Sequence, residues 1–264
     1  MPEKIPRALT VAGSDSSGGA GIQADLKTFA ALGVYGLSVV TSVTAQNTLE
    51  VSGAHDLPGQ FVGLQFDAVM NDIGCDAAKL GMLSNEKIIE TVAGKIDQYA
   101  IEKLVVDPVM RSKDGTALLR NSTDILKKEI IPRALIVTPN IPEAEILSSV
   151  SISDISDMKT AAEKIHSLGA KTVLVKGGHL AKDRPATDLF FNGETFEELV
   201  RERIETKNTH GTGCTFSAAV CAFLARGMSL SVSLENSKAF VTEAIRNSLE
   251  IGKGHGPLNH FGKN

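Results

Sequence analysis

Residues 8–32 read ALTVAGSDSSGGAGIQADLKTFAAL and predict a strand, a glycine-rich turn and a helix in direct succession. The strand covers residues 8–12, a short apolar run, and the helix covers residues 22–32, where apolar side chains recur at helical spacing. A strand that passes through a glycine-rich turn into a helix is typical of an α/β protein with a parallel sheet.

The same alternation continues along the chain. Further strands are expected at residues 38–43, 78–81, 104–107, 135–138 and 172–176, and further helices at residues 86–99, 124–130, 158–168, 212–226 and 230–249. Asn192-Gly193 separates residues 188–191 from residues 194–200, which predicts a β-hairpin. Continuous apolar strands separated by helices indicate a mostly parallel sheet covered on both faces. Without a repeat, linker or low-complexity segment, we expect one domain over residues 1–264.

The composition is that of an ordinary globular chain. Its 264 residues are 42% hydrophobic and 22% charged, enough to bury a core without a disulfide or metal. The net charge of -4 argues against a general nucleic-acid binder, which needs a basic face. An anionic ligand stays possible, because backbone N–H groups can bind phosphate.

The cysteines and the start of the chain bear on where the protein works. Cys75, Cys214 and Cys221 have no CxxC spacing, which excludes a disulfide framework and a zinc site. The apolar stretch near Met1 is too short for a signal peptide or a membrane span. We therefore expect a cytoplasmic protein with neither a membrane nor a nucleic acid as its partner.

Two glycine-rich turns stand where a strand or loop meets a helix. The first, residues 12–21, lacks both the GxxxxGK[ST] and the GxGxxG spacing. It is either a flexible turn that needs positive φ or a place where a ligand approaches the backbone. The second, residues 208–215, would direct several N–H groups of Gly211, Thr212, Gly213 and Cys214 at one point, as phosphoryl transfer requires. A tight helix start without a ligand uses the same residue types, so spacing leaves both alternatives open.

Taken in order, the motifs resemble the hydroxymethylpyrimidine/phosphomethylpyrimidine kinases of thiamin synthesis, members of the ribokinase-like superfamily. They are GSDSSGGAGIQADLK (13–27), TSVTAQN (41–47), KLGM (79–82), DPVM (107–110), TPNIPE (138–143), VKGGH (175–179) and THGTGC (209–214). The resemblance implies a three-layer α/β sandwich, and ATP with Mg²⁺ as cofactors. It also implies phosphorylation of 4-amino-5-hydroxymethyl-2-methylpyrimidine and then of its monophosphate. Relatives are commonly homodimers.

Gln46 is the expected pyrimidine-recognition residue. Its carboxamide offers an acceptor beside a donor, which matches the edge of an aminopyrimidine. Without the resemblance, Gln46 would be interpreted as an exposed loop glutamine. The resemblance implies instead that the family's pyrimidine-contacting Gln lies at this position. The resemblance also puts Gly13, Asp25, Met82 and Val109 in the substrate pocket. Met82 and Val109 could equally be core residues, and Asp25 a solvated helix residue.

Cys214 stands where the wider superfamily carries an aspartate that accepts the hydroxyl proton. A thiol at a helix N-terminus should have a lowered pKa, so its thiolate could be the base beside the anion-binding glycines Gly211 and Gly213. The alternative is that Cys214 only packs, as free cysteines usually do.

Four polar residues complete the implied site. Glu143 would hold magnesium through water, with Asp107 in the outer shell, unless Glu143 merely favours a helix start. Lys176, Asn140 and Thr212 are expected at the nucleotide, although a lone strand-end lysine can be a solvent anchor. Most of these residues follow predicted strands, and open α/β sheets bind ligands at the carboxyl ends of their strands.

Three other functions compete with this interpretation. A pyridoxal kinase would perform the same chemistry on a related ring. A non-catalytic pyrimidine sensor would lack turnover, and the intact 140–143, Lys176 and 211–214 elements argue against it. A Rossmann dehydrogenase would need a fingerprint that is absent.

Overall fold

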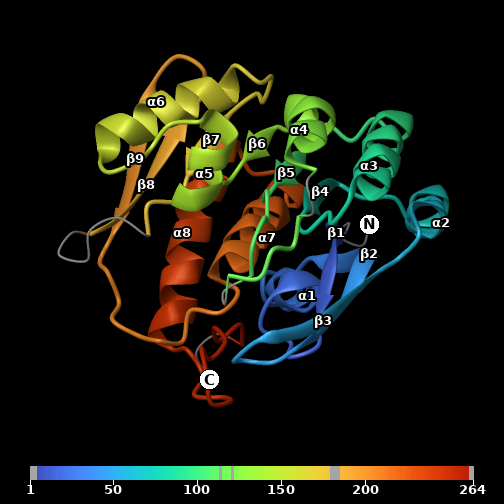
Figure 1. Cartoon of the computed structure of the whole chain (residues 1–264), viewed down its shortest axis with the longest axis horizontal. Helices are drawn as coiled ribbons and strands as arrows, with labels where there is room; N and C mark the ends of the chain where they lie inside the picture. The colour runs from blue at the N-terminus through green and yellow to red at the C-terminus, as the bar shows by residue number, and fades with distance from the viewer. Residues whose placement is uncertain (1–4, 113–114, 120–121, 179–184, 262–264) are drawn as a thin grey trace.

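The computed structural model describes residues 5–112, 115–119, 122–178 and 185–261. Within these ranges nine strands form one sheet in the order β3-β2-β1-β4-β5-β6-β7-β8-β9 (Figure 1). The strands are β1 (Arg7–Asp15), β2 (Tyr35–Gln46), β3 (Val51–Asp56), β4 (Ala77–Leu80), β5 (Leu104–Val106), β6 (Ile136–Val137), β7 (Val173–Val175), β8 (Ala186–Phe191) and β9 (Phe196–Arg201). The six strands from β2 to β7 in this order are parallel, while β3, β8 and β9 pair antiparallel at the edges. The single domain expected over residues 1–264 would contain one continuous sheet of this kind.

Helices cover both faces of the sheet. They are α1 (Gly21–Ala31), α2 (Gly59–Asp72), α3 (Glu86–Gln98), α4 (Thr123–Ile125), α5 (Ile141–Ser148), α6 (Ile155–His166), α7 (Thr212–Ala225) and α8 (Leu230–Arg246). In Figure 1, α1, α7 and α8 lie side by side, and their apolar residues form one buried cluster with one face of the strands. Helices α2 to α6 pack on the other face in a second cluster. The predicted ribokinase-like three-layer sandwich is confirmed.

Alternation along the strands explains the two layers. In β5, Leu104 and Val106 belong to the cluster on the α3 side, whereas Val105 belongs to the cluster on the α7 side. Both faces of such a strand are buried, so its sequence is apolar without interruption. Among the described residues no helix is long and apolar enough to cross a membrane.

The sequence interpretation missed three elements and misplaced some ends. Strand β3, helix α2 and helix α5 were not predicted. Strand β3 is an exposed edge strand with a glycine and polar residues, and α2 leaves Phe61 and Leu64 exposed, which blurs its apolar stripe. Strand β2 runs to Gln46 instead of ending at residue 43.

Other boundaries differ by a few residues. Residues 124–130 are helical as expected, but only as the short α4 followed by a π-helical turn at Leu126–Ile130. Helix α8 ends at Arg246 rather than at residue 249. The predicted hairpin forms, yet β9 starts at Phe196, because the Asn192 side chain accepts from the backbone N–H groups of Glu194 and Thr195 and so closes a longer loop.

The packing of α2, a helix that was not predicted from the sequence, can be tested with two of its phenylalanines. Phe66 has no exposed surface and packs in the core, whereas Phe61 on the same helix is 51% exposed. We expect Phe66→Ala to lower the free energy of unfolding by about 3–5 kcal/mol, because it leaves a cavity. Phe61→Ala, the matched control, should change it by less than about 1 kcal/mol. Urea denaturation measures both, and equal losses would contradict the packing of α2.

Candidate active site

The two glycine-rich turns touch each other at the carboxyl edge of the sheet. Gly211, the N-cap of α7, has φ +82°, and a Cβ on it would collide with the carbonyl oxygen of Gly19. A Cβ on Gly19 would in turn collide with the ring of His210. The glycines at these positions are therefore required by the contact between the turns themselves. Their predicted approach to a ligand stays a prediction.

Asp15 organises the first turn and ties it to the second. One carboxylate oxygen accepts from the backbone and the hydroxyl of Ser17, at 2.8 and 2.7 Å. The other accepts from the backbone N–H groups of Gly19 (3.2 Å) and Ala20 (2.8 Å) and pairs with Nε2 of His210 at 2.8 Å. Burial acts to raise the pKa of Asp15, but the bonds from His210 and Ser17 outweigh it and hold this pKa below its ordinary value. Sequence reasoning missed both Asp15 and His210.

Asp107 and Lys176 meet beneath the start of α7. Nζ of Lys176 donates to Asp107 at 2.7 Å, and the hydroxyl of Ser217 donates to the other oxygen at 3.3 Å. A Cβ on Gly213 would lie 3.0 Å from Nζ of Lys176, which places the ammonium against the first turn of the helix. Burial acts to lower the pKa of Lys176, but Asp107 and Glu143 outweigh it, and the pKa is raised. The lysine, the carboxylate and the predicted anion-binding turn are thus brought together.

Asn140 and Glu143 form a capping box at the start of α5. The Asn140 side chain accepts from the backbone of Glu143 at 2.9 Å, and the Glu143 carboxylate accepts from the backbone of Asn140 at 2.9 Å. Glu143 therefore does stabilise the start of α5, which was the alternative to a magnesium-binding role. Glu143 is 6% exposed, and burial, with repulsion from Asp107, raises its pKa to about 7 against the pull of Lys176.

This carboxylate environment fits a divalent cation. In the described ranges no group of three or more metal-ligating side chains exists. Magnesium, however, is often held by one or two carboxylates, with phosphates and waters as its other ligands. Asp107 and Glu143 are buried and mutually repulsive, so added positive charge beside them would be stabilising.

Cys214 lies in the first turn of α7, but its predicted ionisation is wrong. Burial raises the pKa of the Cys214 thiol to about 11, which outweighs the opposing ammonium of Lys79. The carboxylates of Asp25 and Asp107 act in the same direction as burial. A position at a helix N-terminus is therefore insufficient here to lower the pKa of the thiol.

Asp25 is neither a solvated helix residue nor an exposed pocket residue. It is completely buried on α1, where its carboxylate pairs with Nζ of Lys79 at 2.8 Å and accepts from Thr10 at 2.6 Å. Burial acts to lower the pKa of Lys79, but attraction to Asp25 outweighs it, so the ammonium is retained. The alternative of a solvated helix residue is therefore wrong, and the predicted place of Asp25 at the substrate pocket stays a prediction.

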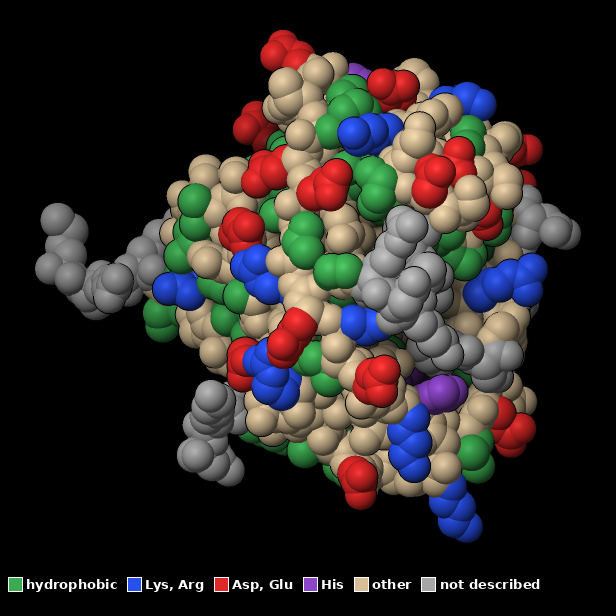
Figure 2. Space-filling view, turned by 90° about the vertical axis from the view of Figure 1, so that its left-hand side faces the viewer, with side chains coloured by type: hydrophobic (Ala, Val, Ile, Leu, Met, Phe, Trp, Pro, Cys, Tyr) green, Lys and Arg blue, Asp and Glu red, His purple; other side chains and the backbone are tan. Residues whose placement is uncertain are grey.

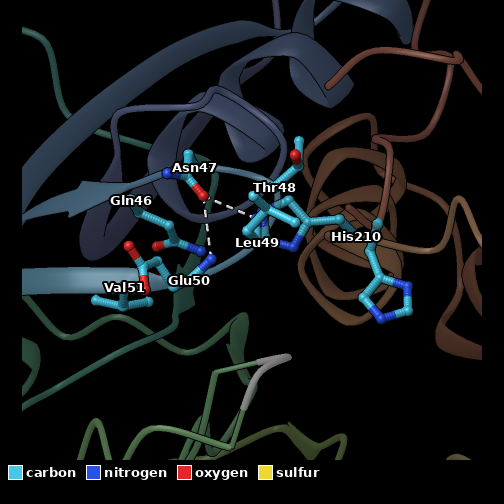
Figure 3. A pocket seen from close by; sticks show the side chains of 8 residues that line it. Gln46, Asn47, Thr48, Leu49, Glu50, Val51 and His210 are labelled. Carbon is cyan, nitrogen blue, oxygen red and sulfur yellow. Dashed lines mark hydrogen bonds between the residues drawn. The ribbon is translucent and has the colours of Figure 1, made fainter. Parts of the chain in front are cut away.

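Gln46 ends β2 beside the first glycine turn. The Ser16 hydroxyl donates to its carbonyl and accepts from its N–H, both at 2.8 Å, and Thr44 donates to its side-chain oxygen at 3.2 Å. A cavity of about 110 Å³ opens here; its lining residues are Gln46, Asn47, Thr48, Leu49, Glu50, Val51, His210 and His255. Figure 3 shows His210 across from the turn that Asn47 closes by accepting from the N–H groups of Leu49 and Glu50.

The other expected pocket residues lie away from this cavity. Gly13 and Met82 are in contact, since a Cβ on Gly13 would lie 2.9 Å from the Met82 sulfur. Met82 is 8% exposed, and Val109, half-buried, follows Asp107 after β5. None of these three lines the cavity at Gln46. His179 of the VKGGH motif lies outside the described residues.

A three-layer α/β fold with a glycine-rich helix start, a lysine and two carboxylates at one sheet edge has the parts that phosphoryl transfer uses, and the similar solved structures are kinases of the ribokinase-like class. The family model for phosphomethylpyrimidine kinase matches residues 15–259, and the chain belongs to this family.

Individual relatives agree with this placement. The chain is 52% identical to the hydroxymethylpyrimidine/phosphomethylpyrimidine kinase of Bacillus subtilis, over 97% of this chain and 95% of that protein. Its structure is similar to the ADP complex of Bacillus subtilis pyridoxal kinase (TM-score 0.91, 40% identity, 97% of this chain and 98% of the other). It is also similar to phosphomethylpyrimidine kinase from Clostridium difficile (TM-score 0.81, 45% identity, 92% and 100%).

The raised pKa of Cys214 leads to a direct chemical prediction. Thiolate is the reactive form, so carbamidomethylation of Cys214 in the ligand-free protein should accelerate by about tenfold per pH unit from pH 7 to pH 10. Mass spectrometry of the peptides after short iodoacetamide pulses measures the rate, with Cys214→Ser as the control for assignment. A plateau reached by pH 8 would instead indicate a lowered pKa.

Proposed function

We propose that this kinase transfers a phosphoryl group from ATP to 4-amino-5-hydroxymethyl-2-methylpyrimidine and then phosphorylates the resulting monophosphate, in thiamin biosynthesis. The observation that carries the proposal is the start of α7, whose Gly213 lies against Nζ of Lys176. The name of the Bacillus subtilis relative states both kinase activities.

The proposed chemistry uses the N–H groups of the Gly211–Cys214 turn as fixed donors. They would stabilise the charge that develops on the transferred phosphoryl group, with the dipole of α7 behind them. Lys176 would contact the nucleotide phosphates from the sheet side, and Thr212 would contact them from the helix side. Positioning and charge stabilisation account for most of the catalysis in kinases, so this turn would supply its main part.

ATP is the proposed phosphoryl donor, and magnesium its counterion. The similar structure of Bacillus subtilis pyridoxal kinase is an ADP complex, and its fold is shared by this chain. Asp107 and Glu143 would hold the ion, largely through water. When bound, magnesium neutralises phosphate charge during transfer.

Cys214 remains the proposed base for the alcohol, but the proposal now takes its raised pKa into account. With a pKa of about 11, only on the order of one thiol in 10⁴ is ionised at pH 7 in the ligand-free protein. The alcohol step would therefore depend on a minor thiolate population and rise with pH. The monophosphate acceptor is already ionised near neutrality, so the second transfer needs no base.

Pyridoxal is the second candidate substrate. The TM-score to the Bacillus subtilis pyridoxal kinase is higher than that to the Clostridium difficile phosphomethylpyrimidine kinase, although the sequence identity is lower. A shared backbone leaves the choice of ring to side chains such as Gln46.

A cytoplasmic location and a homodimer complete the proposal. The three cysteines are free, as the cytoplasm would keep them. On the face in Figure 2, acidic and basic side chains are interspersed, and no basic surface for nucleic acid gathers there.

A ³¹P NMR time course with hydroxymethylpyrimidine, ATP and magnesium tests the function. The alcohol monophosphate should appear first and the diphosphate later, with ADP formed in step. A parallel reaction with pyridoxal measures the competing activity. Faster turnover of pyridoxal would overturn the proposed substrate, and no ADP with either ring would indicate a non-catalytic binding protein.

Gln46→Leu tests the recognition residue. The substitution keeps approximate bulk but leaves the polar edge of the bound ring unpaired, so kcat/KM for the pyrimidine should fall by roughly ten- to a hundredfold. The KM for ATP should stay near the wild-type value. Gln98→Leu, an exposed glutamine on α3, is the matched control. Normal kinetics in Gln46→Leu would remove Gln46 from the site.

Glu143→Gln tests the metal role together with the raised pKa. Glutamine can keep the capping box, but without the charge we expect more magnesium to be needed for half-maximal rate. A carboxyl whose pKa is raised to about 7 on folding stabilises the protein below its ordinary value of 4.5, and this stability is lost as the pH rises through 7.

The ligand-free Glu143→Gln protein should therefore be more stable than wild type at pH 8.5, by on the order of 2 kcal/mol, and the difference should shrink toward pH 5. Urea denaturation at several pH values measures this, with the exposed Glu163→Gln as control. An unchanged magnesium titration would leave Glu143 with only its helix-start role.

A further inference from the structure

We infer that His210 is a positioning residue, which fixes the distance between the phosphoryl-transfer turn and the substrate-recognition turn through its bond to Asp15. The inference rests on the proposed function, because it assigns Gln46 to the acceptor and the Gly211–Cys214 turn to the phosphate. His210 lines the cavity at Gln46, but the role inferred for it is the placement of the two turns and not a contact with either reactant.

The contacts form an unbroken path between the two parts of the site. Gln46 is held through its own backbone by the hydroxyl of Ser16, at 2.8 Å in both directions. Ser16 directly follows Asp15, whose carboxylate pairs with Nε2 of His210 at 2.8 Å. His210 directly precedes Gly211, the N-cap of α7. The Asp15–His210 bond is therefore the side-chain link between the two turns, beside the direct backbone contact of Gly19 with Gly211.

The bond is built to be rigid. The Asp15 and His210 side chains are only 3% and 7% exposed. Since the carboxylate accepts, Nε2 of His210 carries a proton and the ring orientation is fixed. The backbone N–H of His210 donates to the carbonyl of Gly256 at 3.1 Å, so the ring projects from an anchored position. Gly19 is packed against the ring so closely that a Cβ there would collide with it.

Rigid placement matters because in-line transfer is sensitive to distance. A misplacement of about 1 Å can cost on the order of a hundredfold in rate without loss of binding. A residue that only shapes the cavity would change the affinity for the pyrimidine. A residue that only stabilises the fold would change the melting temperature. A positioning residue instead changes the rate of the chemical step.

The test compares His210→Phe with His210→Gln in the full-length protein. Phenylalanine keeps the ring but removes the donor, whereas glutamine can place a donor near the position of Nε2. We expect the single-turnover rate with ATP and hydroxymethylpyrimidine to fall by about ten- to a hundredfold in His210→Phe and to recover most of the loss in His210→Gln. Dissociation constants for the pyrimidine and for a non-hydrolysable ATP analogue should change by less than about threefold.

Two further variants sharpen the outcome. Asp15→Asn disturbs the bonds of the carboxylate to Ser17, Gly19 and Ala20 as well as its bond to His210. Combined with His210→Phe, it should therefore cost little more than Asp15→Asn alone. His166→Phe, at the end of α6 and packed on Phe191, reports the general effect of this substitution and should keep full rate.

The inference is overturned if His210→Phe transfers at the wild-type rate, or if the two losses in the double variant multiply. It is equally overturned if the loss lies wholly in pyrimidine affinity, or if His210→Gln is as slow as His210→Phe. An inactive wild-type protein would instead refute the proposed function, so the two failures are distinguishable.

Discussion

The active-site edge of this protein depends on the close approach of two backbone turns, residues 13–21 and residues 208–214. A side chain on Gly19 or Gly211 would prevent this contact, and Asp15 and His210 hold it together. Because α1 follows the first turn and α7 follows the second, the contact also sets how these two helices pack on the sheet. The geometry of the start of α7 is thus a property of the tertiary fold and not of one loop.

Charge placement under this contact follows a consistent pattern. Lys79 pairs with Asp25, and Lys176 pairs with Asp107, so each buried ammonium has a carboxylate within 2.8 Å. Glu143 has no ion pair at such a distance among the contacts described, and burial, the largest effect, raises its pKa together with repulsion from Asp107. The Cys214 thiol has a raised pKa chiefly because it is buried, and the carboxylates of Asp25 and Asp107 add to this effect against the ammonium of Lys79.

The sequence was sufficient to predict the fold, and it also predicted that Lys176, Asp107 and the start of α7 lie at one edge of the sheet. Strands such as β5 are buried on both faces, so they are apolar throughout and easily recognised, and the residues that follow β5, β6 and β7 end at one edge by topology alone. The ionisation of Cys214 and the burial of Asp25 could not be predicted, since both depend on which distant side chains enclose them. Asp15 was hidden for a different reason: a carboxylate that caps its own turn resembles any loop aspartate until its partner His210 is placed.

The proposed roles divide the site into two parts that the fold supports differently. The proposed phosphate-binding part comprises the start of α7, Lys176 and Asp107, which lie against one another at the carboxyl edge of the sheet. The proposed recognition part is the end of β2 and the turn before β3, at the sheet's edge, where Asn47, Leu49 and Glu50 are exposed. Changes at an edge cost little stability, because few buried contacts depend on them. In the proposed function, substrate choice would therefore be set at the hairpin and the transfer chemistry at α7, with the Asp15–His210 bond keeping the two parts at a fixed distance.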